Sequence, residues 1–162
     1  MSDIIITEPL TPGPFSLFGD VLETNGEPDK IINQGMCGRF HDRARVDFGD
    51  GGRAGISLFK ARARTLPHTL DMVERHPDGS QAFIPMSMHP FLVVVATDIA
   101  GKPGEPKAFV TQPGQGVNFL RNTWHGVLTP LHEPGLFAVI DRIGNTPNIE
   151  EYWFETQYVV KS

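Results

Sequence analysis

Glycine and proline interrupt this chain at short intervals along its whole length. They supply 17 and 14 of its 162 residues, and they are scattered rather than gathered into one linker. Glycine weakens regular elements and proline breaks helices and central strands, so the chain has little room for long helices. The apolar runs between them are short and rich in β-branched and aromatic residues, which is typical of strands. The spacing therefore predicts many short strands joined by turns.

Short apolar runs mark the expected strands. The run Phe-Leu-Val-Val-Val-Ala at 91–96 is continuous and β-branched, so we expect a strand that is buried on both faces. Pro85 cannot donate a ladder hydrogen bond, which predicts an edge strand or a bulge for the run at 81–86. The strand segments predicted most clearly are 54–60, 81–86, 91–96, 107–111, 116–119, 124–128 and 136–141.

The length and the even composition predict a single domain over residues 1–162. Helical periodicity is weak, and short helices are expected only at 12–18 and 149–154. Several strands at roughly ten-residue spacing, with turn signals between them, predict a mainly all-β fold, either a sandwich or a barrel. A small β-barrel or jelly roll can hold a ligand at its mouth.

Charge and cysteine content limit the functional classes. The formal charge is −5, and the basic run Lys-Ala-Arg-Ala-Arg at 60–64 is interpreted as a solvated strand face rather than a nucleic-acid footprint. Cys37 is the single cysteine, so neither an internal disulfide nor a thiolate metal cluster can form. The first residues lack a secretory pattern, and no apolar run is long enough to cross a bilayer. We expect a cytoplasmic protein that binds neither nucleic acid nor membrane.

A first polar segment, Glu-Arg-His-Pro-Asp-Gly-Ser-Gln, begins at Glu74. In an extended chain Glu74 and His76 share one face, whereas Arg75 points to the other. The Pro-Asp-Gly turn reverses the chain, which returns along a strand that begins at Gln81. Such a hairpin could direct Glu74, His76 and Gln81 to one point. The residue types alone favour the alternative, a hairpin end exposed to solvent.

A second polar segment, Gly-Val-Asn-Phe-Leu-Arg-Asn-Thr-Trp-His-Gly, contains Asn118, Arg121 and His125. Trp124 and Leu128 are expected on the strand face opposite His125. Taken singly, His125 is better explained as a core histidine bound to a carbonyl, and Arg121 as a surface side chain. The repetition of an arginine and a histidine on two apolar strands favours a pocket instead.

Three blocks, ERHPDGSQAFIPM, GVNFLRNTWHGVL and FAVIDR, occur in this order. Together with the opening EPLT and FGDVLET, and with IINQG and RFHD, they resemble the ureidoglycolate lyase family of allantoin degradation, formerly called ureidoglycolate hydrolase. The resemblance covers nearly the whole chain. It implies a cupin-like β-barrel, a homodimer, and conversion of (S)-ureidoglycolate to glyoxylate and urea in purine and nitrogen metabolism. A divalent metal, nickel in particular, is associated with some members.

The implied reaction needs acid–base groups but no external nucleophile. Ureidoglycolate carries a carboxylate, a hydroxyl and a ureido group on one carbon, so eliminating urea removes the hydroxyl proton and protonates the departing nitrogen. The sequence accordingly lacks nucleophile-elbow, Walker, His-Glu-x-x-His and Cys-x-x-Cys motifs. His125 and His76 titrate near neutrality and are the predicted catalytic pair, with Glu74 as an orienting group or base.

Four further side chains are predicted to bind the substrate. Arg121 or Arg75 would hold its carboxylate, because the guanidinium fork binds a carboxylate with two hydrogen bonds. Gln81 and Asn118 would hold the ureido group through donor–acceptor pairs.

A metal centre is the alternative to simple acid–base elimination. His76, Gln81 and His125, together with Glu74, offer nitrogen and oxygen ligands that suit a borderline divalent ion. The usual metal-cupin signature, His-x-His followed by Glu, is absent, so the metal-free mechanism is preferred. Two other interpretations stay open: a cupin-like metal-dependent enzyme for another small carboxylate, and a barrel that binds a ureide without turnover.

Overall fold

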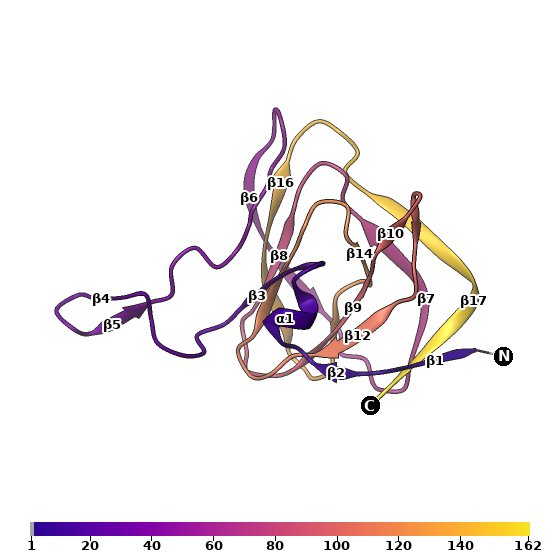
Figure 1. The fold of residues 1–162 in the computed structure, drawn as a ribbon, viewed down its shortest axis with the longest axis horizontal. Helices are drawn as coiled ribbons and strands as arrows, with labels where there is room; N and C mark the ends of the chain where they lie inside the picture. The colour runs from indigo at the N-terminus through magenta and orange to yellow at the C-terminus, as the bar shows by residue number, and fades with distance from the viewer. Residues whose placement is uncertain (1) are drawn as a thin grey trace.

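The larger sheet of the protein curls into a nearly closed ring (Figure 1). In this computed structural model, which describes residues 2–162, consecutive strands β1 and β2 pair in parallel with β17 and β12, at opposite edges of the sheet. The order around the ring is β1 (Asp3–Ile6), β17 (Glu150–Lys161), β7 (His68–Arg75), β14 (Trp124–His125), β9 (Phe91–Ala96), β12 (Lys107–Val110) and β2 (Glu8–Pro9), with β15 (Thr129–Pro130) paired to β9.

A second sheet lies beside the ring (Figure 1). Its order is β3 (Gly19–Leu22), β13 (Gly116–Phe119), β8 (Gln81–Pro85), β16 (Gly135–Ile143) and β6 (Arg53–Ala61). A short helix, α1 (Pro12–Phe15), and the small hairpins β4 (Lys30–Ile32)–β5 (Cys37–Arg39) and β10 (Asp98–Ile99)–β11 (Lys102–Pro103) complete the described elements. This arrangement agrees with the predicted, mainly all-β, cupin-like barrel.

Two apolar clusters fill the molecule. The first lies between the sheets, where Val93 and Val95 of β9 meet Phe83 and Phe119 of the second sheet, and Phe15 of α1 packs against it. The second draws residues from every long strand of the ring and therefore fills its inside. Its buried members are Ile5, Leu70, Val73, Leu92, Val94, Ala96, Ala108, Trp124 and Val160. All six residues of β9 are buried, which confirms the strand predicted to be covered on both faces.

Three local predictions are wrong, each because tertiary pairing overrides a local signal. The helix expected at 149–154 is instead part of β17, which pairs with β7. Pro85 does not mark an edge, because β8 lies between β13 and β16 and Pro85 is its last residue, beyond the pairing with β13. Leu128 packs in the first cluster rather than beside Trp124, because β14 already ends at His125 and the alternation stops there.

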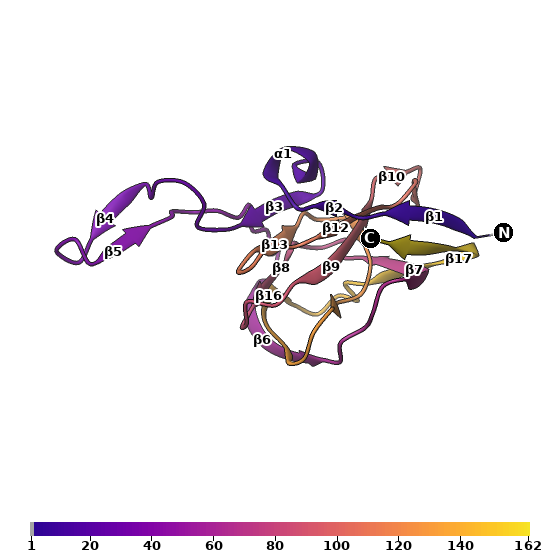
Figure 2. The same ribbon diagram turned by 90° about the horizontal axis from the view of Figure 1, so that it is seen from below.

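A long arm leaves the second sheet between β3 and β6. Figure 2 shows that its hairpin, β4–β5, lies well away from both sheets. The arm carries exposed apolar side chains, among them Ile31 and Met36. Within residues 2–162 no helix is both long enough and apolar enough to cross a membrane.

Candidate active site

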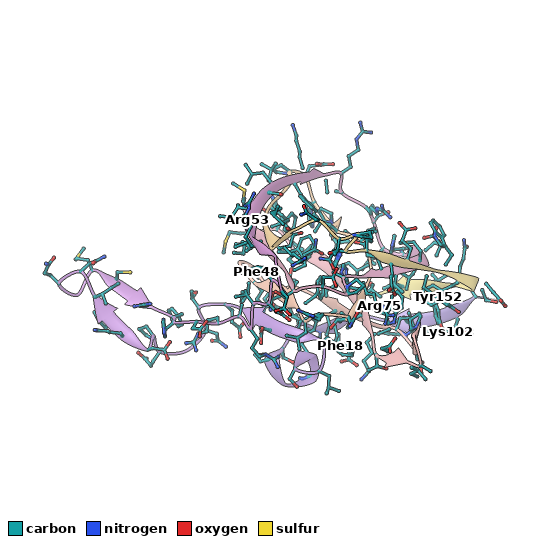
Figure 3. All side chains as sticks on the ribbon, turned by 90° about the horizontal axis from the view of Figure 1, so that it is seen from above. Phe18, Phe48, Arg53, Arg75, Lys102 and Tyr152 are labelled. Atoms are coloured by element: carbon teal, nitrogen blue, oxygen red, sulfur yellow. The ribbon has the colours of Figure 1, made fainter. Side chains whose placement is uncertain are left out.

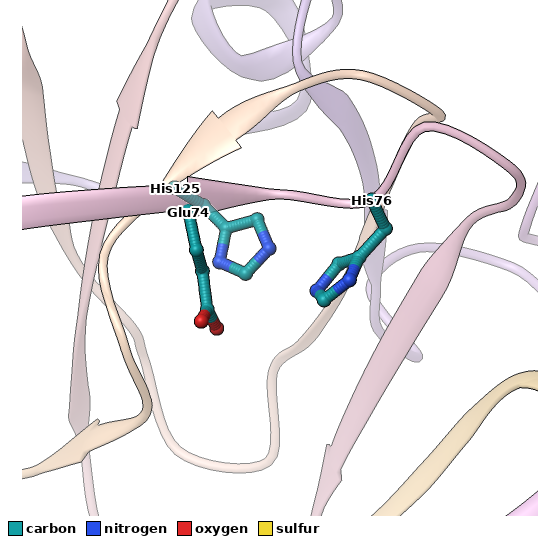
Figure 4. Close-up of side chains that lie close together, drawn as sticks. All are labelled: Glu74, His76 and His125. Carbon is teal, nitrogen blue, oxygen red and sulfur yellow. The ribbon is translucent and has the colours of Figure 1, made fainter. Parts of the chain in front are cut away.

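Three ionisable side chains meet on the face of the ring that is turned toward the second sheet. Glu74 of β7 and His125 of β14 are register partners, so their side chains lie on the same face. His76 follows Glu74 by two residues and joins them, as strand alternation predicts (Figure 4). One potential ligand atom from each residue lies within 4.8 Å of the others.

Backbone carbonyls fix the tautomer of both histidines. Nδ1 of His76 lies 2.7 Å from the carbonyl oxygen of Asn148, and Nδ1 of His125 lies 2.9 Å from that of Gly126. A carbonyl can only accept a hydrogen bond, so each Nδ1 carries the proton. The lone pair of each neutral ring then sits on Nε2. Both Nε2 atoms are buried and have no hydrogen-bond partner among residues 2–162.

Burial disfavours the charged forms of both His125 and Glu74. Burial lowers the pKa of His125 to about 3, and the neighbouring His76 adds to this effect, so His125 is neutral at pH 7. Burial also raises the pKa of the half-buried Glu74 carboxyl; His76 opposes this shift, and Glu151 of β17 supports it. A neutral His125 can donate its lone pair, but it cannot serve as the proton donor near neutrality.

The second sheet supplies the facing wall. The Phe119 ring stacks on the His125 ring, with centroids 4.2 Å apart and planes within 1°. Gln81 is the register partner of Phe119, and Asp141 is the partner of Gln81, so the three side chains form a row on this face. Nε2 of Gln81 donates to the Asp141 carboxylate at 3.0 Å. Gln81 Oε1 is buried and lacks a partner among the described residues.

The loop after β7 is held by Asn148. Its side-chain oxygen accepts the backbone N–H of Asp78 at 2.7 Å, while its carbonyl accepts from His76. The carbonyl of His76 accepts in turn from the backbone N–H of Asn122. These contacts tie the Pro-Asp-Gly turn to two other loops, and they fix the position of the His76 ring.

Arg75 is not brought to these three residues. It lies on the opposite face of β7, as the alternation predicts, with its guanidinium 4.4 Å from the centre of the Trp124 ring. It forms ion pairs with Asp98 and Glu150, both at 2.8 Å. Figure 3 shows Arg75 on the same side of the molecule as Tyr152, whose ring contacts Trp124.

Arg121 and Asn118 are also engaged elsewhere. Arg121 is exposed and forms two hydrogen bonds of 2.8 Å with the Asp47 carboxylate, which lower the pKa of that carboxyl. Asn118 is fully buried on the face of β13 opposite Phe119, where it donates to Asp20 and to the carbonyl of Arg45. Their predicted substrate-binding roles therefore find no support in these contacts.

The model of a family described as ureidoglycolate lyase matches residues 2–161. The chain belongs to the ureidoglycolate lyase family. A ureidoglycolate lyase of Rhodobacter capsulatus is 60% identical over 148 residues, which cover 91% of this chain and 92% of that protein. Ureidoglycolate lyase 2 of Rhizobium meliloti is 53% identical over 154 residues, or 94% of each chain. A ureidoglycolate lyase of Chelativorans sp. is 50% identical over 157 residues, or 96% and 95% of the two chains. The resemblance seen in the three sequence blocks is confirmed.

A hollow of about 360 Å³ runs along β7, next to the candidate active site. It is lined by His68 and Met72 of β7, by Gly126 next to His125, and by Arg64. Arg64 is exposed, as the solvated interpretation of the basic run at 60–64 predicts, and it borders this hollow. His68 and Met72 have the same parity as Glu74 on β7, whereas Asp71, which also lines the hollow, has the opposite parity.

The depressed pKa of His125 predicts a loss of stability in acid. The His125 side chain takes up a proton near pH 6.5 in the unfolded chain, but only near pH 3 in the folded protein. The free energy of unfolding therefore falls as the pH drops through this window. We expect the wild type to lose on the order of 4 kcal/mol more than His125→Gln between pH 7 and pH 3. Urea unfolding with chelator present measures both; equal losses would contradict the assignment.

Proposed function

We infer that the chain is a ureidoglycolate lyase that converts (S)-ureidoglycolate to glyoxylate and urea. The single observation that carries the mechanism is the pair of buried, unpartnered Nε2 atoms beside the Glu74 carboxylate. The family model covers nearly the whole chain, and Glu74, His76 and His125 lie together as the sequence predicted. Both findings are best explained if the chain is an active member of the family. Neither a ureide-binding barrel nor an enzyme for another carboxylate is favoured by a specific contact.

A divalent metal fits these residues, in contrast to the metal-free mechanism preferred from sequence. Two imidazoles beside a carboxylate, with one ligand atom of each within 4.8 Å of the others, offer the nitrogen and oxygen donors that suit a borderline divalent ion. Nδ1–H donation to a backbone carbonyl is also the usual support of a metal-binding histidine. We propose His76 and His125 as ligands, with the neighbouring Glu74 carboxylate as the base, and nickel as the ion. When bound, it would supply Lewis acidity toward the substrate hydroxyl.

The residues of the chain carry the proton transfer. The Glu74 carboxylate accepts the hydroxyl proton, the electron pair of that O–H bond forms the aldehyde C=O, and the C–N bond breaks. The same proton returns from Glu74 to the departing urea nitrogen, so atoms and charge balance without a co-reactant. Its raised pKa suits Glu74 to both halves of this transfer. His125, neutral and stacked on Phe119, keeps the site rigid and dry.

The substrate carboxylate needs a cation, and Arg64 is the proposed anchor. Arg64 lines the hollow together with Asp71, and two other lining residues, Met72 and Gly126, lie next to Glu74 and His125 along their strands. Arg75 and Arg121, the anchors expected from sequence, are already paired with carboxylates. Binding in the hollow would leave the reacting carbon next to Glu74.

Replacing the three ionisable residues tests the activity. We expect His76→Ala, His125→Ala and Glu74→Gln each to lower glyoxylate release by about 10²-fold or more, because each removes a ligand or the base. His76→Ala and His125→Ala should also lose bound metal. Purified protein is assayed for glyoxylate, urea, ammonia and metal content, with and without chelator.

His89→Ala is the matched control, because His89 is exposed and stacks on His132 at the surface. It should keep full activity and metal content. Wild-type rates in the His76, His125 and chelated samples would contradict the metal proposal. Absence of glyoxylate from the wild type under every condition would contradict the function itself, and ammonia in place of urea would indicate a hydrolase.

Arg64→Ala tests the carboxylate anchor. We expect KM for ureidoglycolate to rise about tenfold or more with a smaller change in kcat, since an exposed charge-assisted pair contributes mainly to binding. Arg62→Ala, two residues away and exposed, is the control and should leave KM unchanged. Equal effects of the two substitutions would remove Arg64 from the site.

We also propose that the protein is a homodimer joined through the outer face of the second sheet. Two cross-strand rows on this face are apolar: Leu58–Ala138–Ile84 and Ile56–Ile140–Ala82. Ile56 and Leu58 are 75% and 73% exposed. The arm projects from the same sheet, beyond the barrel, where it could pack against a second copy (Figures 1 and 2).

We also propose that the reaction takes place in the cytoplasm, as a step of allantoin degradation.

Light scattering tests the dimer. The wild type should have twice the chain mass of 17.9 kDa. Leu58→Glu should shift it toward the monomer, because a charge in the apolar interface is costly. Leu17→Glu, at an exposed position near α1, should leave the mass unchanged. A monomeric wild type would contradict the proposal.

A further inference from the structure

Asp141 holds the Gln81 amide in one orientation. The Gln81 amide group lies 3.0 Å from the Asp141 carboxylate. An ionised carboxylate accepts hydrogen bonds and has none to donate, so the amide nitrogen must face Asp141. The amide oxygen is therefore the end of Gln81 that is left for another partner.

That oxygen is buried, and Gln81 lies on the strand face that carries Phe119. Gln81 is 6% exposed, and its Oε1 has no hydrogen-bond partner among residues 2–162. Gln81 lies beside Phe119 as its cross-strand neighbour, and the Phe119 ring stacks on His125. A buried acceptor without a partner costs free energy, so such a group is retained where a ligand supplies the missing donor.

We propose that Gln81 Oε1 accepts an N–H from the terminal amide of the substrate's ureido group, with Asp141 as a positioning residue. The proposal rests on the proposed function. An acceptor beside a carboxylate repels the substrate carboxylate and selects an N–H donor, which the terminal amide provides. The ureido end would then lie against the second sheet, at Gln81.

Two unreactive ligands of nearly equal shape test this contact. N-carbamoylglycine carries the terminal NH2 but lacks the hydroxyl, and N-acetylglycine replaces that NH2 by a methyl group. Titration calorimetry on the metal-loaded wild type should show N-carbamoylglycine binding about tenfold or more tightly, because the methyl group leaves Oε1 unpaired. Equal affinities would overturn the proposal without any substitution.

The variants separate binding from positioning. Gln81→Met keeps the volume but removes the acceptor, so the affinity ratio of the two ligands should fall to near one. Asp141→Asn frees the amide to rotate and should lower the ratio about threefold or more, whereas Asp141→Glu should restore part of it. General damage would weaken both ligands and leave their ratio unchanged. A wild-type ratio in Gln81→Met would overturn the proposal, and a wild-type ratio in Asp141→Asn would remove the positioning role.

The outcome stays separate from that of the proposed function. Normal glyoxylate release with no discrimination between the two ligands would reject only the Gln81 contact. Absence of both glyoxylate release and N-carbamoylglycine binding would reject the lyase assignment and the contact together.

Discussion

The candidate active site depends on one cross-strand pair, His125 of β14 opposite Glu74 of β7. β14 is only two residues long, and it bridges β7 and β9 in the ring. Because partners in an antiparallel pair point to the same face, this register puts the imidazole and the carboxylate side by side. A shift of one residue would bring Trp124 to this face and turn His125 into the apolar inside of the ring.

The histidines become useful because the backbone fixes their protons. Asn148 and Gly126 accept the Nδ1 protons of His76 and His125, which leaves Nε2 of each ring without a partner, and burial keeps His125 neutral. Neither ring needs a second side chain to orient it. The Phe119 ring covers one side of His125 and excludes water there. The strand order of the second sheet brings Gln81 to the facing wall, beside Phe119. The residue proposed to recognise the substrate therefore lies near the two histidines.

Alternation and turn chemistry were enough to predict part of this site. Glu74 and His76 share a face and Arg75 takes the other, as the two-residue period requires, and the strands at 91–96 and 116–119 form as expected. The roles of Asn118 and Arg121 depend on distant partners, Asp20 and Asp47, which no local pattern reveals.

Other features were hidden because they come from pairing over long sequence distances. The segment at 149–154 has a weak helical pattern, but pairing with β7 makes it a strand. Arg64 is exposed, but only the fold shows that it borders the hollow beside β7. The hydrogen bond of Asp141 is made with Gln81, 60 residues earlier in the chain, which no local pattern reveals.

The central claim is that both histidines present an unprotonated Nε2 to one point. Nitrogen-15 NMR of the imidazole rings at pH 7 tests it most directly, first without metal and then with one equivalent of Zn²⁺, a diamagnetic divalent ion. The account predicts that His76 and His125 are both neutral Nδ1–H tautomers, and that Zn²⁺ shifts both Nε2 resonances together. A charged ring, an Nε2–H tautomer at either residue, or Nε2 resonances that do not respond to the ion would contradict it.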